Sequence, residues 1–400
     1  MISFTQAYKI ILDEFNKLEL LIEEVDLLNS LERVLAEDVI ADVDQPPFDN
    51  AAMDGYALKF TKRKSWKIVG EISAGNYSSI TLSEGEAVLI TTGSKIPPGA
   101  DTVIPLEYVD THGNELAIKS NSFLKKGMNI RPRADDLEKG KTAIHSYTRI
   151  NPNVIAALAS CGKIKVKVYS KLKFAVLSTG DELIPINQVP HDDKIRASNN
   201  YSLSAAISGI NHLPVNLGFA KDDKEIIRQK IKDALEMDID MLITTGGVSV
   251  GKYDYLLELF DEAGIKKKFW RVNIKPGKPT YFGIYEKDKK KILVFGLPGN
   301  PVSSLVNFYI FIKPAVDNLY HQNEINFHTA ILQHDLKKKD TKRHFSRGII
   351  FYEEDEWRVK AEFSQSSGNL IEMSRANCLI EIEENKINPL KGEKVKCIMI

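Results

Sequence analysis

The sequence predicts a multidomain α/β protein. It has a central three-layer α/β/α domain with a parallel-rich sheet, flanked by a β-rich second domain and a C-terminal β domain. Two observations predict this fold class. Three wholly apolar runs in mid-chain each end in a glycine-bearing turn and precede a helical pattern, and the regions on both sides show short β-branched runs between turn residues. Apolar strands that alternate with helices are typical of a parallel sheet covered on both faces.

The first 44 residues predict two helices. Ser3 can cap a helix over residues 3–15, where apolar side chains recur at helical spacing, and a second helix is expected over residues 27–35. Two consecutive prolines at 46 and 47 then force an extended or turning chain, which predicts a domain boundary. We assign residues 1–44, together with 145–170, to an N-terminal linking domain.

Residues 45–144 predict the β-rich second domain. Short β-branched runs separated by turn residues occur at 66–69, 87–91, 102–105 and 115–119. In the returning part of the linking domain, residues 153–159 predict a short helix that ends at Gly162, and residues 164–168 alternate as a strand.

Residues 171–322 carry the pattern of the central α/β domain. A helical pattern over residues 302–319 closes this region. Ligands of parallel sheets bind beyond the carboxyl ends of the strands, so the glycine turns there predict a binding site. The apolar runs lie at 174–177, 241–243 and 292–295, and their turns contain Gly180, Gly246, Gly247, Gly296 and Gly299. Residues 323–400 return to β-like alternation and predict the C-terminal β domain.

The charge composition argues against a protein that wraps nucleic acid. The chain has 54 Lys plus Arg and 54 Asp plus Glu, for a net charge of zero, whereas counterion release from phosphates favours basic proteins. We therefore expect no nucleic-acid partner. No uninterrupted apolar stretch reaches 18 residues, and the three cysteines form no CxxC pair, so we expect a cytoplasmic protein without membrane contact.

The glycine-rich signatures of nucleotide enzymes are incomplete. No two glycines are separated by a single residue, and nothing has zinc-ligand spacing, which argues against a dinucleotide enzyme and a zinc hydrolase. Residues 246–252 match GxxxxGK, but Tyr253 stands where a Ser or Thr would bind magnesium. Gly246 and Gly247 can still present backbone N–H groups to an anion. A plain tight turn is the alternative.

A lysine-bearing turn and an aspartate-bearing segment offer opposite charges. Residues 275–279 read KPGKP, and the rigid prolines direct Lys275 and Lys278 into one region, which suits a phosphate or another oxyanion. A solvated loop is the alternative. Asp49 and Asp54 lie five positions apart among small residues and are, taken alone, more typical of turns than of catalysis.

Five segments together resemble the molybdopterin molybdenumtransferase family, the MoeA type of bacteria that is equivalent to the E-domain of gephyrin. The segments follow the family's order and span nearly the whole chain. They are PPFDNAAMDGYA at 46–57, STGDEL at 178–183, TTGGVSVGKYDY at 244–255, IKPGKP at 274–279 and GLPGNPVS at 296–303.

The resemblance implies an enzyme that inserts molybdate into adenylylated molybdopterin, with release of AMP and with Mg²⁺ as cofactor. It also implies a homodimer in which the α/β molybdopterin-binding domain of one subunit and the second domain of the other form each site. Contact with the enzymes of molybdopterin synthesis is a further expected partnership.

Carried over by position, the resemblance implies two sets of site residues. Asp54, Glu182 and Asp254 are expected as catalytic groups and as magnesium ligands, because carboxylate oxygens suit this cation. Lysines would attract the molybdate dianion. The residues expected to bind the substrates are Thr92, Asp136, Asp223 or its neighbour Asp222, Gly246, Gly247, Ser249, Lys275, Lys278, Pro298, Pro301, Arg347 and Ser367.

Two other functions remain alternatives at this point. A molybdopterin adenylyltransferase has a similar Gly-Gly turn and Pro-Gly-Asn-Pro loop, but its single domain would leave about 250 residues of this chain unexplained. A gephyrin-like scaffold that has lost its activity would keep the same fold, since a fold does not fix a function. Molybdate-dependent release of AMP is the most informative assay, since a scaffold would release none.

Overall fold

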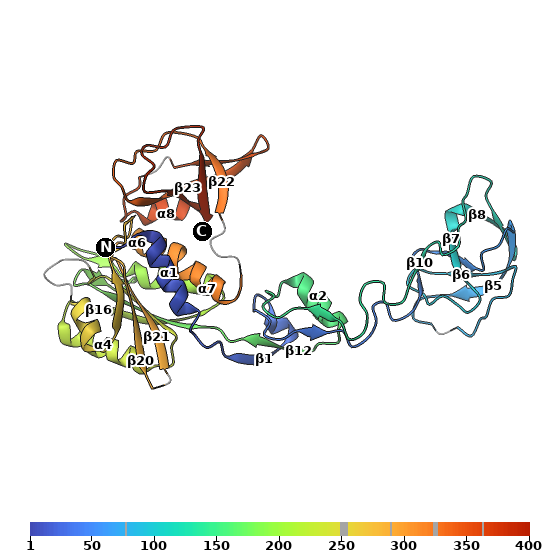
Figure 1. Cartoon of the computed structure of the whole chain (residues 1–400), viewed down its shortest axis with the longest axis horizontal. Coiled ribbons are helices and arrows are strands. Elements are labelled where there is room, and N and C mark those ends of the chain that lie inside the picture. The colour runs from blue at the N-terminus through green and yellow to red at the C-terminus, as the bar shows by residue number, and fades with distance from the viewer. Residues whose placement is uncertain (77, 249–254, 289, 323–326, 362–363) are drawn as a thin grey trace. The chain divides into compact units, whose positions relative to one another are not determined.

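The chain folds into two compact units. The structure is a computed structural model that describes residues 1–400 except 77, 249–254, 289, 323–326 and 362–363. One unit contains Met1–Glu23 and Tyr169–Ile400, and the other contains Glu24–Val168 (Figure 1). None of the helices described is long and apolar enough to cross a membrane.

The first unit is built on a six-stranded sheet. Its order is β16 (Leu213–Ala220), β13 (Lys173–Thr179), β17 (Met241–Thr245), β21 (Lys290–Leu297), β20 (Tyr281–Lys287) and β18 (Lys266–Trp270). The first four strands are parallel, and β20 and β18 complete the sheet in antiparallel fashion. The predicted parallel-rich α/β domain is therefore confirmed, with the glycine turns after β13, β17 and β21.

Helices cover both faces of this sheet. On one face, α4 (Lys224–Glu236) and α5 (Leu256–Glu262) share a core with Val294 of β21. On the other face, Phe295 contacts Phe15 of α1 (Phe4–Phe15), with 6.4 Å between the ring centroids. The further helices of the unit are α3 (Ser198–Gly209), α6 (Pro301–Asn307), the π-helical segment η3 (Phe308–Ile312), α7 (Lys313–Leu319) and α8 (Leu370–Arg375).

Helix α1 belongs to a different unit from the one that we expected. Ser3 caps it through the amide of Gln6, as predicted. We expected residues 1–44 to form a linking domain, but Met1–Glu23 belong to the unit that contains the α/β sheet. The reason is the apolar face of α1, because the ring of Phe4 packs in a tilted arrangement against Phe311 and Phe345, with 5.2 Å between the ring centroids in each pair.

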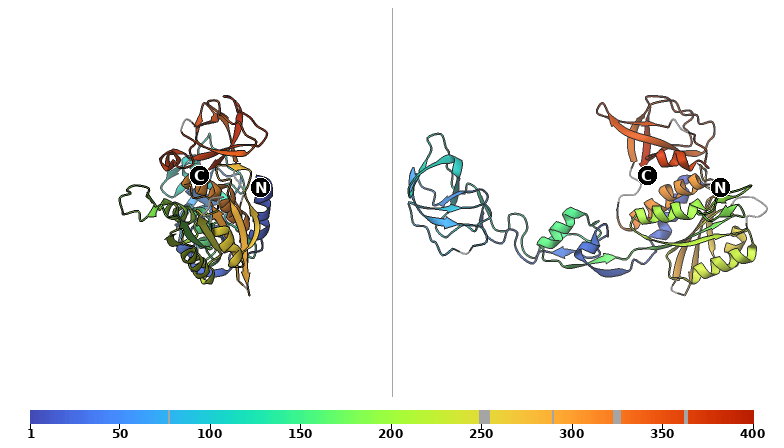
Figure 2. Two further views of the ribbon diagram at one scale, coloured as in Figure 1. Left: turned by 90° about the vertical axis from the view of Figure 1, so that its left-hand side faces the viewer. Right: turned by 180° about the vertical axis from the view of Figure 1, so that it is seen from behind.

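The C-terminal strands close into a barrel. In order they are β23 (Arg343–Glu353), β24 (Glu356–Lys360), β22 (Phe327–Leu332), β26 (Lys394–Met399) and β25 (Cys378–Ile382), and β25 pairs again with β23. A short strand, β19 (Ile274–Lys275), joins the barrel by pairing with β23. Figure 2 shows this barrel, in orange to red, as a body distinct from the α/β sheet. The expected C-terminal β domain is confirmed.

The second unit contains the β-rich domain that the sequence predicts. Two apolar clusters, one with Val88 and one with Trp66, pack against the sheet. The strand order is β7 (Thr102–Pro105), β4 (Gly55–Leu58), β6 (Glu86–Ile90), β5 (Ser65–Ile72), β9 (Glu115–Ile118) and β8 (Val109–His112), with a short 3-10 helix, η2 (Leu106–Tyr108).

Among the residues that the structure describes, the rest of this unit consists of short strand pairs, one 3-10 helix and one α-helix. The predicted helix over 27–35 is wrong. Only η1 (Leu27–Ser30) is helical there, because the amide of Leu35 donates to the carbonyl of Thr148 and Leu35 bridges Val168. The pairs are β1 (Ile22–Asp26) with β12 (Lys165–Tyr169), β2 (Val39–Ile40) with β11 (Thr142–Ile144), and β3 (Asn50–Ala51) with β10 (Ile130–Arg131), beside α2 (Pro152–Ser160).

Candidate functional site

The turns after β13, β17 and β21 converge at one edge of the α/β sheet. The Gly246 amide donates to the carbonyl of Leu297 at 3.1 Å. Gly246 has φ +91°, and a Cβ there would clash with the backbone oxygen of Thr179. A Cβ on Gly299 would lie 3.5 Å from the Cα of Gly246. Glycine at 246 therefore allows the turn after β17 to approach the end of β13 closely, and the turn after β21 lies beside it, as expected where parallel strands end.

A small polar cavity of about 50 Å³ opens beside these turns. Two buried oxygen atoms have no hydrogen-bond partner, Thr179 Oγ1 and Asn199 Oδ1. A cavity of this size can hold one or two waters or the polar edge of a ligand. The residues that line it are Ser178, Thr179, Glu182, Leu183, Ile195, Arg196, Ala197, Ser198, Asn199, Thr245, Gly299 and Pro301.

Two adjacent asparagines lie at the start of α3, and Asn199 lines this cavity. Asn199 Nδ2 donates to the carbonyl of Gly299 at 2.8 Å, which ties α3 to the turn after β21. Asn200 contacts Ser178 and donates to the carbonyl of Gly218 at 2.6 Å. Sequence reasoning did not select Thr179 or Asn199. The signal that could have found them is the pair of consecutive asparagines at the start of this helix, because amide side chains in a helix suggest buried polar contacts.

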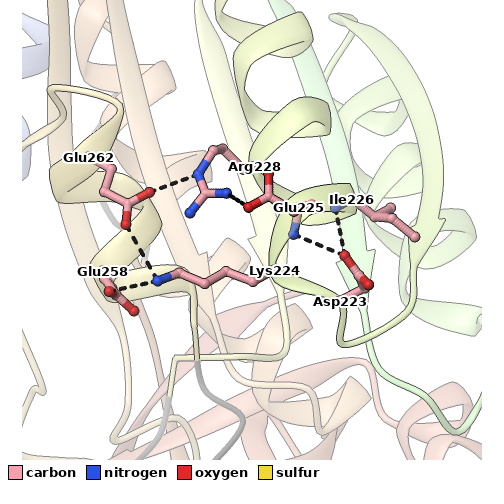
Figure 3. A network of polar contacts seen from close by, with 7 residues as sticks. All are labelled: Asp223, Lys224, Glu225, Ile226, Arg228, Glu258 and Glu262. Atoms are coloured by element: carbon pink, nitrogen blue, oxygen red, sulfur yellow. Dashed lines mark hydrogen bonds and ion pairs between the residues drawn. The ribbon is translucent and has the colours of Figure 1, made fainter.

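The acidic residues near this edge fall into two kinds. Glu182 lines the cavity, and its carboxylate folds back over Gly180, close to the position of a Cβ there. Asp223 instead caps α4, because its Oδ1 accepts the amides of Glu225 at 2.9 Å and Ile226 at 3.0 Å (Figure 3). Its neighbour Asp222 exchanges amide-to-carboxylate contacts with Asp181.

Helix α5, which follows the TTGGVSVGKYDY segment, is tied to α4 by ion pairs (Figure 3). Lys224 Nζ lies 2.7 Å from Glu258, and Arg228 Nε lies 2.8 Å from Glu262. The hydrogen bond that Arg228 donates to Glu262 raises the pKa of Arg228 and lowers the pKa of Glu262. These pairs are exposed, so they orient the two helices and add little stability. The predicted site residues Ser249 and Asp254 lie outside the described residues.

The KPGKP turn is fixed on the same helix that borders the cavity. A Cβ on Gly277, whose φ is +101°, would clash with the buried amide of Asn307 in α6. Thr280 Oγ1 lies 2.6 Å from Asn307 Oδ1, so the turn rests on α6. Pro301 opens α6 and lines the cavity. Helix α6 therefore joins the lysine turn to the strand-end turns, with Lys275 and Lys278 both exposed.

Two predicted substrate contacts lie in the C-terminal region, and one of them, Arg347, is buried. Arg347 is 1% exposed, and its guanidinium donates to the carbonyls of Ser364, Ser366 and Asn369. It therefore shapes the loop that carries Ser367 and does not present its charge to a ligand. The carbonyl of Ser367 accepts the amide of Val302 at 3.2 Å, which places this loop at the N-terminus of α6.

Two prolines, Pro298 and Pro301, help to set the first turn of α6. Pro298 is buried, and its carbonyl accepts a hydrogen bond from Ser304 Oγ at 2.5 Å. Pro301 at the first helical position fits the missing N–H of proline there. The structure therefore brings Glu182, Gly246, Gly247, Pro298, Pro301 and Ser367 to one end of the sheet.

In the second unit, Asp54 and Thr92 form a direct contact. Asp54 Oδ1 accepts both the amide and the hydroxyl of Thr92, each at 2.7 Å. These two hydrogen bonds, the backbone one first, hold the pKa of Asp54 below its usual value. Asp54 precedes β4, and Thr92 follows β6, which pairs with β4. An exposed, ionised carboxylate is therefore fixed at this end of the sheet.

Asp136 lies on an adjacent loop with a cationic partner. Its carboxylate contacts the guanidinium of Arg131, and its amide donates to the carbonyl of Gln45 at 2.9 Å. Arg131 belongs to β10, which pairs with β3 immediately before Asp54. The structure therefore groups Asp54, Thr92 and Asp136 within the second unit.

The described residues contain no group of three or more His, Cys, Asp or Glu side chains that could hold a metal ion. Of the three expected magnesium ligands, Asp54 and Glu182 belong to different units, and Asp254 is not among the residues described. Carboxylate oxygens are the donors that Mg²⁺ prefers. The expected ligands therefore have the donor chemistry that suits Mg²⁺, but neither unit contains both Asp54 and Glu182.

Comparison with known families matches the chain in three parts. Residues 2–162 match the MoeA N-terminal region (domain I and II), residues 175–318 a probable molybdopterin binding domain, and residues 329–400 the MoeA C-terminal region (domain IV). Together the three matched regions cover most of the chain.

Individual relatives agree with this result. A molybdopterin molybdenumtransferase of Haemophilus influenzae is 33% identical over 93% of this chain and 92% of its own. That of Synechocystis is 37% identical over 70% of this chain and 73% of its own. The crystal structure of a molybdopterin biosynthesis MoeA protein from Pyrococcus horikoshii superposes with a TM-score of 0.84, at 29% identity, over 100% of both chains. Fold, motifs and relatives together place this chain in the MoeA family of molybdopterin molybdenumtransferases.

Proposed function

We propose that the protein is a molybdopterin molybdenumtransferase, which inserts molybdate into adenylylated molybdopterin and releases AMP. The observation that carries the proposal is the position of α6. This helix supports the two exposed lysines of the KPGKP turn and also borders the polar cavity at the strand ends. An oxyanion and a larger polar ligand could therefore be bound on one rigid support.

The charges explain how molybdate would be attracted. Lys275 and Lys278 are both exposed. The turn that carries them is held in place because Gly277 packs against the side chain of Asn307. Two ammonium groups attract a dianion by direct Coulomb interaction. Gly246 and Gly247 both have positive φ, +91° and +60°, so their turn can direct N–H groups to a phosphate. We propose that the lysines bind molybdate and that the strand-end turns bind the phosphorylated pterin.

Asp54 and Thr92 are proposed to act on the phosphoanhydride that links AMP. The two hydrogen bonds from Thr92 keep Asp54 ionised, and an ionised carboxylate can orient an attacking oxygen or bind a cation. We include Mg²⁺ in the proposal because Asp54, Glu182 and Asp254 offer carboxylate oxygens, which this cation prefers. When bound, the cation would neutralise the charge that develops as AMP leaves.

A homodimer is part of the same proposal. The second unit exposes aliphatic side chains on two segments that are joined by a backbone hydrogen bond from the amide of Leu27 to the carbonyl of Ile164. Leu28 is 79% exposed and Ile164 82% exposed. Exposed apolar patches of this kind favour association. A dimer would let the Asp54 region of one subunit reach the α/β site of the other.

Three further assignments remain proposals. We keep 45–144, 171–322 and 323–400 as domains, with the linking domain reduced by the segment Met1–Glu23. We propose a cytoplasmic location, because all three cysteines are free and buried thiols. We also propose contact with the enzymes of molybdopterin synthesis, which would pass on the adenylylated substrate directly.

The function is tested by the release of AMP. The full-length protein is incubated with adenylylated molybdopterin, Mg²⁺ and molybdate, and AMP is quantified by chromatography. We expect release that requires molybdate and is abolished by Asp54→Asn, with the unfolding temperature unchanged. Glu286→Gln, which removes an exposed carboxylate paired with Lys266 at 3.2 Å, is the matched control and should keep full activity.

The alternatives give different results in this assay. An adenylyltransferase would consume ATP and attach AMP to molybdopterin, which the same assay detects when ATP and molybdopterin are supplied. A scaffold without activity would release no AMP under any condition. Either result would contradict the proposed function.

A further inference from the structure

The lysine turn is in contact with the C-terminal barrel. Strand β19 pairs in parallel with β23, so that Lys275 lies opposite His344 in the register. Lys275 Nζ lies 3.9 Å from Asp340 Oδ2, with side chains 59% and 35% exposed. A residue of the barrel region is therefore the ion-pair partner of a lysine that we propose to bind molybdate.

Asp340 is itself held on the side away from Lys275. His344 Nε2 lies 2.8 Å from Asp340 Oδ1, and the amide of Lys342 donates to the same oxygen at 3.0 Å. The buried Lys338 donates to the carbonyl of Asp340 at 2.9 Å and to that of Glu384 at 2.8 Å. Both the side chain and the backbone of Asp340 are thus fixed, while Oδ2 faces Lys275.

The protonation states favour this arrangement at neutral pH. Burial lowers the pKa of His344, and the charges of Lys275 and Lys338 lower it further against the opposing effect of Asp340. The lowered pKa favours the neutral form of His344 at pH 7, in which an Nε2 proton can be donated to Asp340. Burial alone would raise the pKa of Asp340, but hydrogen bonds from His344 and Lys342 lower it. An ionised Asp340 thus faces the ammonium.

We propose that Asp340, oriented by His344, is a positioning residue that holds the Lys275 ammonium in place for the oxyanion substrate. This inference rests on the proposed function and extends it to the barrel region. A lysine with four rotatable bonds loses side-chain entropy when it binds a ligand. Asp340 restricts Lys275 beforehand, so less ordering remains for the substrate to impose.

The ion pair between Asp340 and Lys275 should affect the affinity for molybdate and leave the rate of the chemical step unchanged. Asp340→Asn keeps the shape of the side chain and its contact to His344 but removes the ion pair. We expect the dissociation constant of molybdate, measured by calorimetry on the full-length protein, to rise by about three- to tenfold. The KM for molybdate should rise equally, while kcat and the KM for adenylylated molybdopterin stay unchanged.

Two variants of His344 separate positioning from folding. His344→Ala removes the hydrogen bond to Asp340 and should weaken molybdate binding in the same way. His344→Gln retains a donor at a similar reach and should restore most of the affinity. Glu286→Gln breaks a comparable exposed Lys–Glu pair within the α/β sheet and should leave molybdate binding unchanged.

A second readout does not depend on catalysis. A lysine held by a carboxylate reacts more slowly with an acylating reagent than a free one, and labelling can be followed by mass spectrometry. In Asp340→Asn, Lys275 should be labelled at least about twofold faster, with Lys278 on the same turn as the internal reference.

The outcomes distinguish this inference from the proposed function. A wild-type protein that releases no AMP, with molybdate binding still weakened in Asp340→Asn, would contradict the enzyme activity alone. Unchanged or tighter molybdate binding in Asp340→Asn would overturn the positioning role, whatever the activity. An equal loss of molybdate affinity in His344→Gln and His344→Ala would contradict the role of the hydrogen bond between His344 and Asp340.

Discussion

Glu14 is the residue that we expect to fix helix α1 on the α/β sheet. Its carboxylate is 7% exposed and lies 2.9 Å from each of three ammonium groups, those of Lys17, Lys268 and Lys291. Lys268 belongs to β18 and Lys291 to β21. Burial alone would raise the pKa of Glu14, but the hydrogen bonds from Lys268, Lys17 and Lys291 lower it from 4.5 to about 2.

This pKa sets the size and the pH dependence of the effect. A carboxyl group with its pKa lowered from 4.5 to about 2 on folding contributes about 3 kcal/mol. Partial exposure of the lysines screens the interaction, so Glu14→Gln should cost about 2 to 3 kcal/mol at pH 7. Because the folded pKa is depressed, the contribution is present in full above about pH 4.5 and is lost as the pH falls towards 2.

Hydrogen exchange and thermal unfolding measure this prediction. In Glu14→Gln, the amides of α1 should exchange faster at pH 7, and the unfolding temperature of the first unit should fall by about 5–10 °C. The difference from the wild type should shrink between pH 5 and pH 3. Glu286→Gln is the control for an exposed pair. A destabilisation that is as large at pH 3 as at pH 7, or absent at pH 7, would refute the reasoning.

Three further substitutions test other parts of the structure. Gly277→Ala should destabilise the lysine turn by about 2 kcal/mol and weaken molybdate binding, because its φ is +101° and the new Cβ would clash with a buried amide; calorimetry checks both effects. Thr92→Val removes one of the two hydrogen bonds to Asp54, so the pKa of Asp54 should rise in an NMR titration. Arg347→Met leaves three carbonyls without their donor and should speed hydrogen exchange in residues 364–369 by about tenfold or more; unchanged exchange would contradict the loop-shaping role.

The sequence predicts the α/β sheet well because burial there leaves a strong local signal. The runs 174–177, 241–243 and 292–295 lie in strands that are buried on both faces, and every residue in these runs is apolar. The helix predicted at 27–35 fails for the opposite reason. Its leucines occur at helical spacing, but Leu35 is buried by pairing with Val168, which is distant in sequence.

The candidate site could be predicted in part. Glycine turns and the lysine turn are local features, so Gly246, Gly247 and Lys275 were accessible from the sequence. The role of Arg347 was not, because its partners are backbone carbonyls, which carry no mark in the side-chain sequence. The contact of Lys275 with Asp340 spans 65 positions and depends on the register of β19 against β23.

The central claim is that molybdenum is transferred to the pterin when AMP is released. The most direct test measures both products of one reaction, AMP by chromatography and molybdenum in the protein-free pterin fraction by mass spectrometry. The proposed function predicts one molybdenum incorporated for each AMP released, with no incorporation by Asp54→Asn. Release of AMP without molybdenum in the pterin fraction would contradict it.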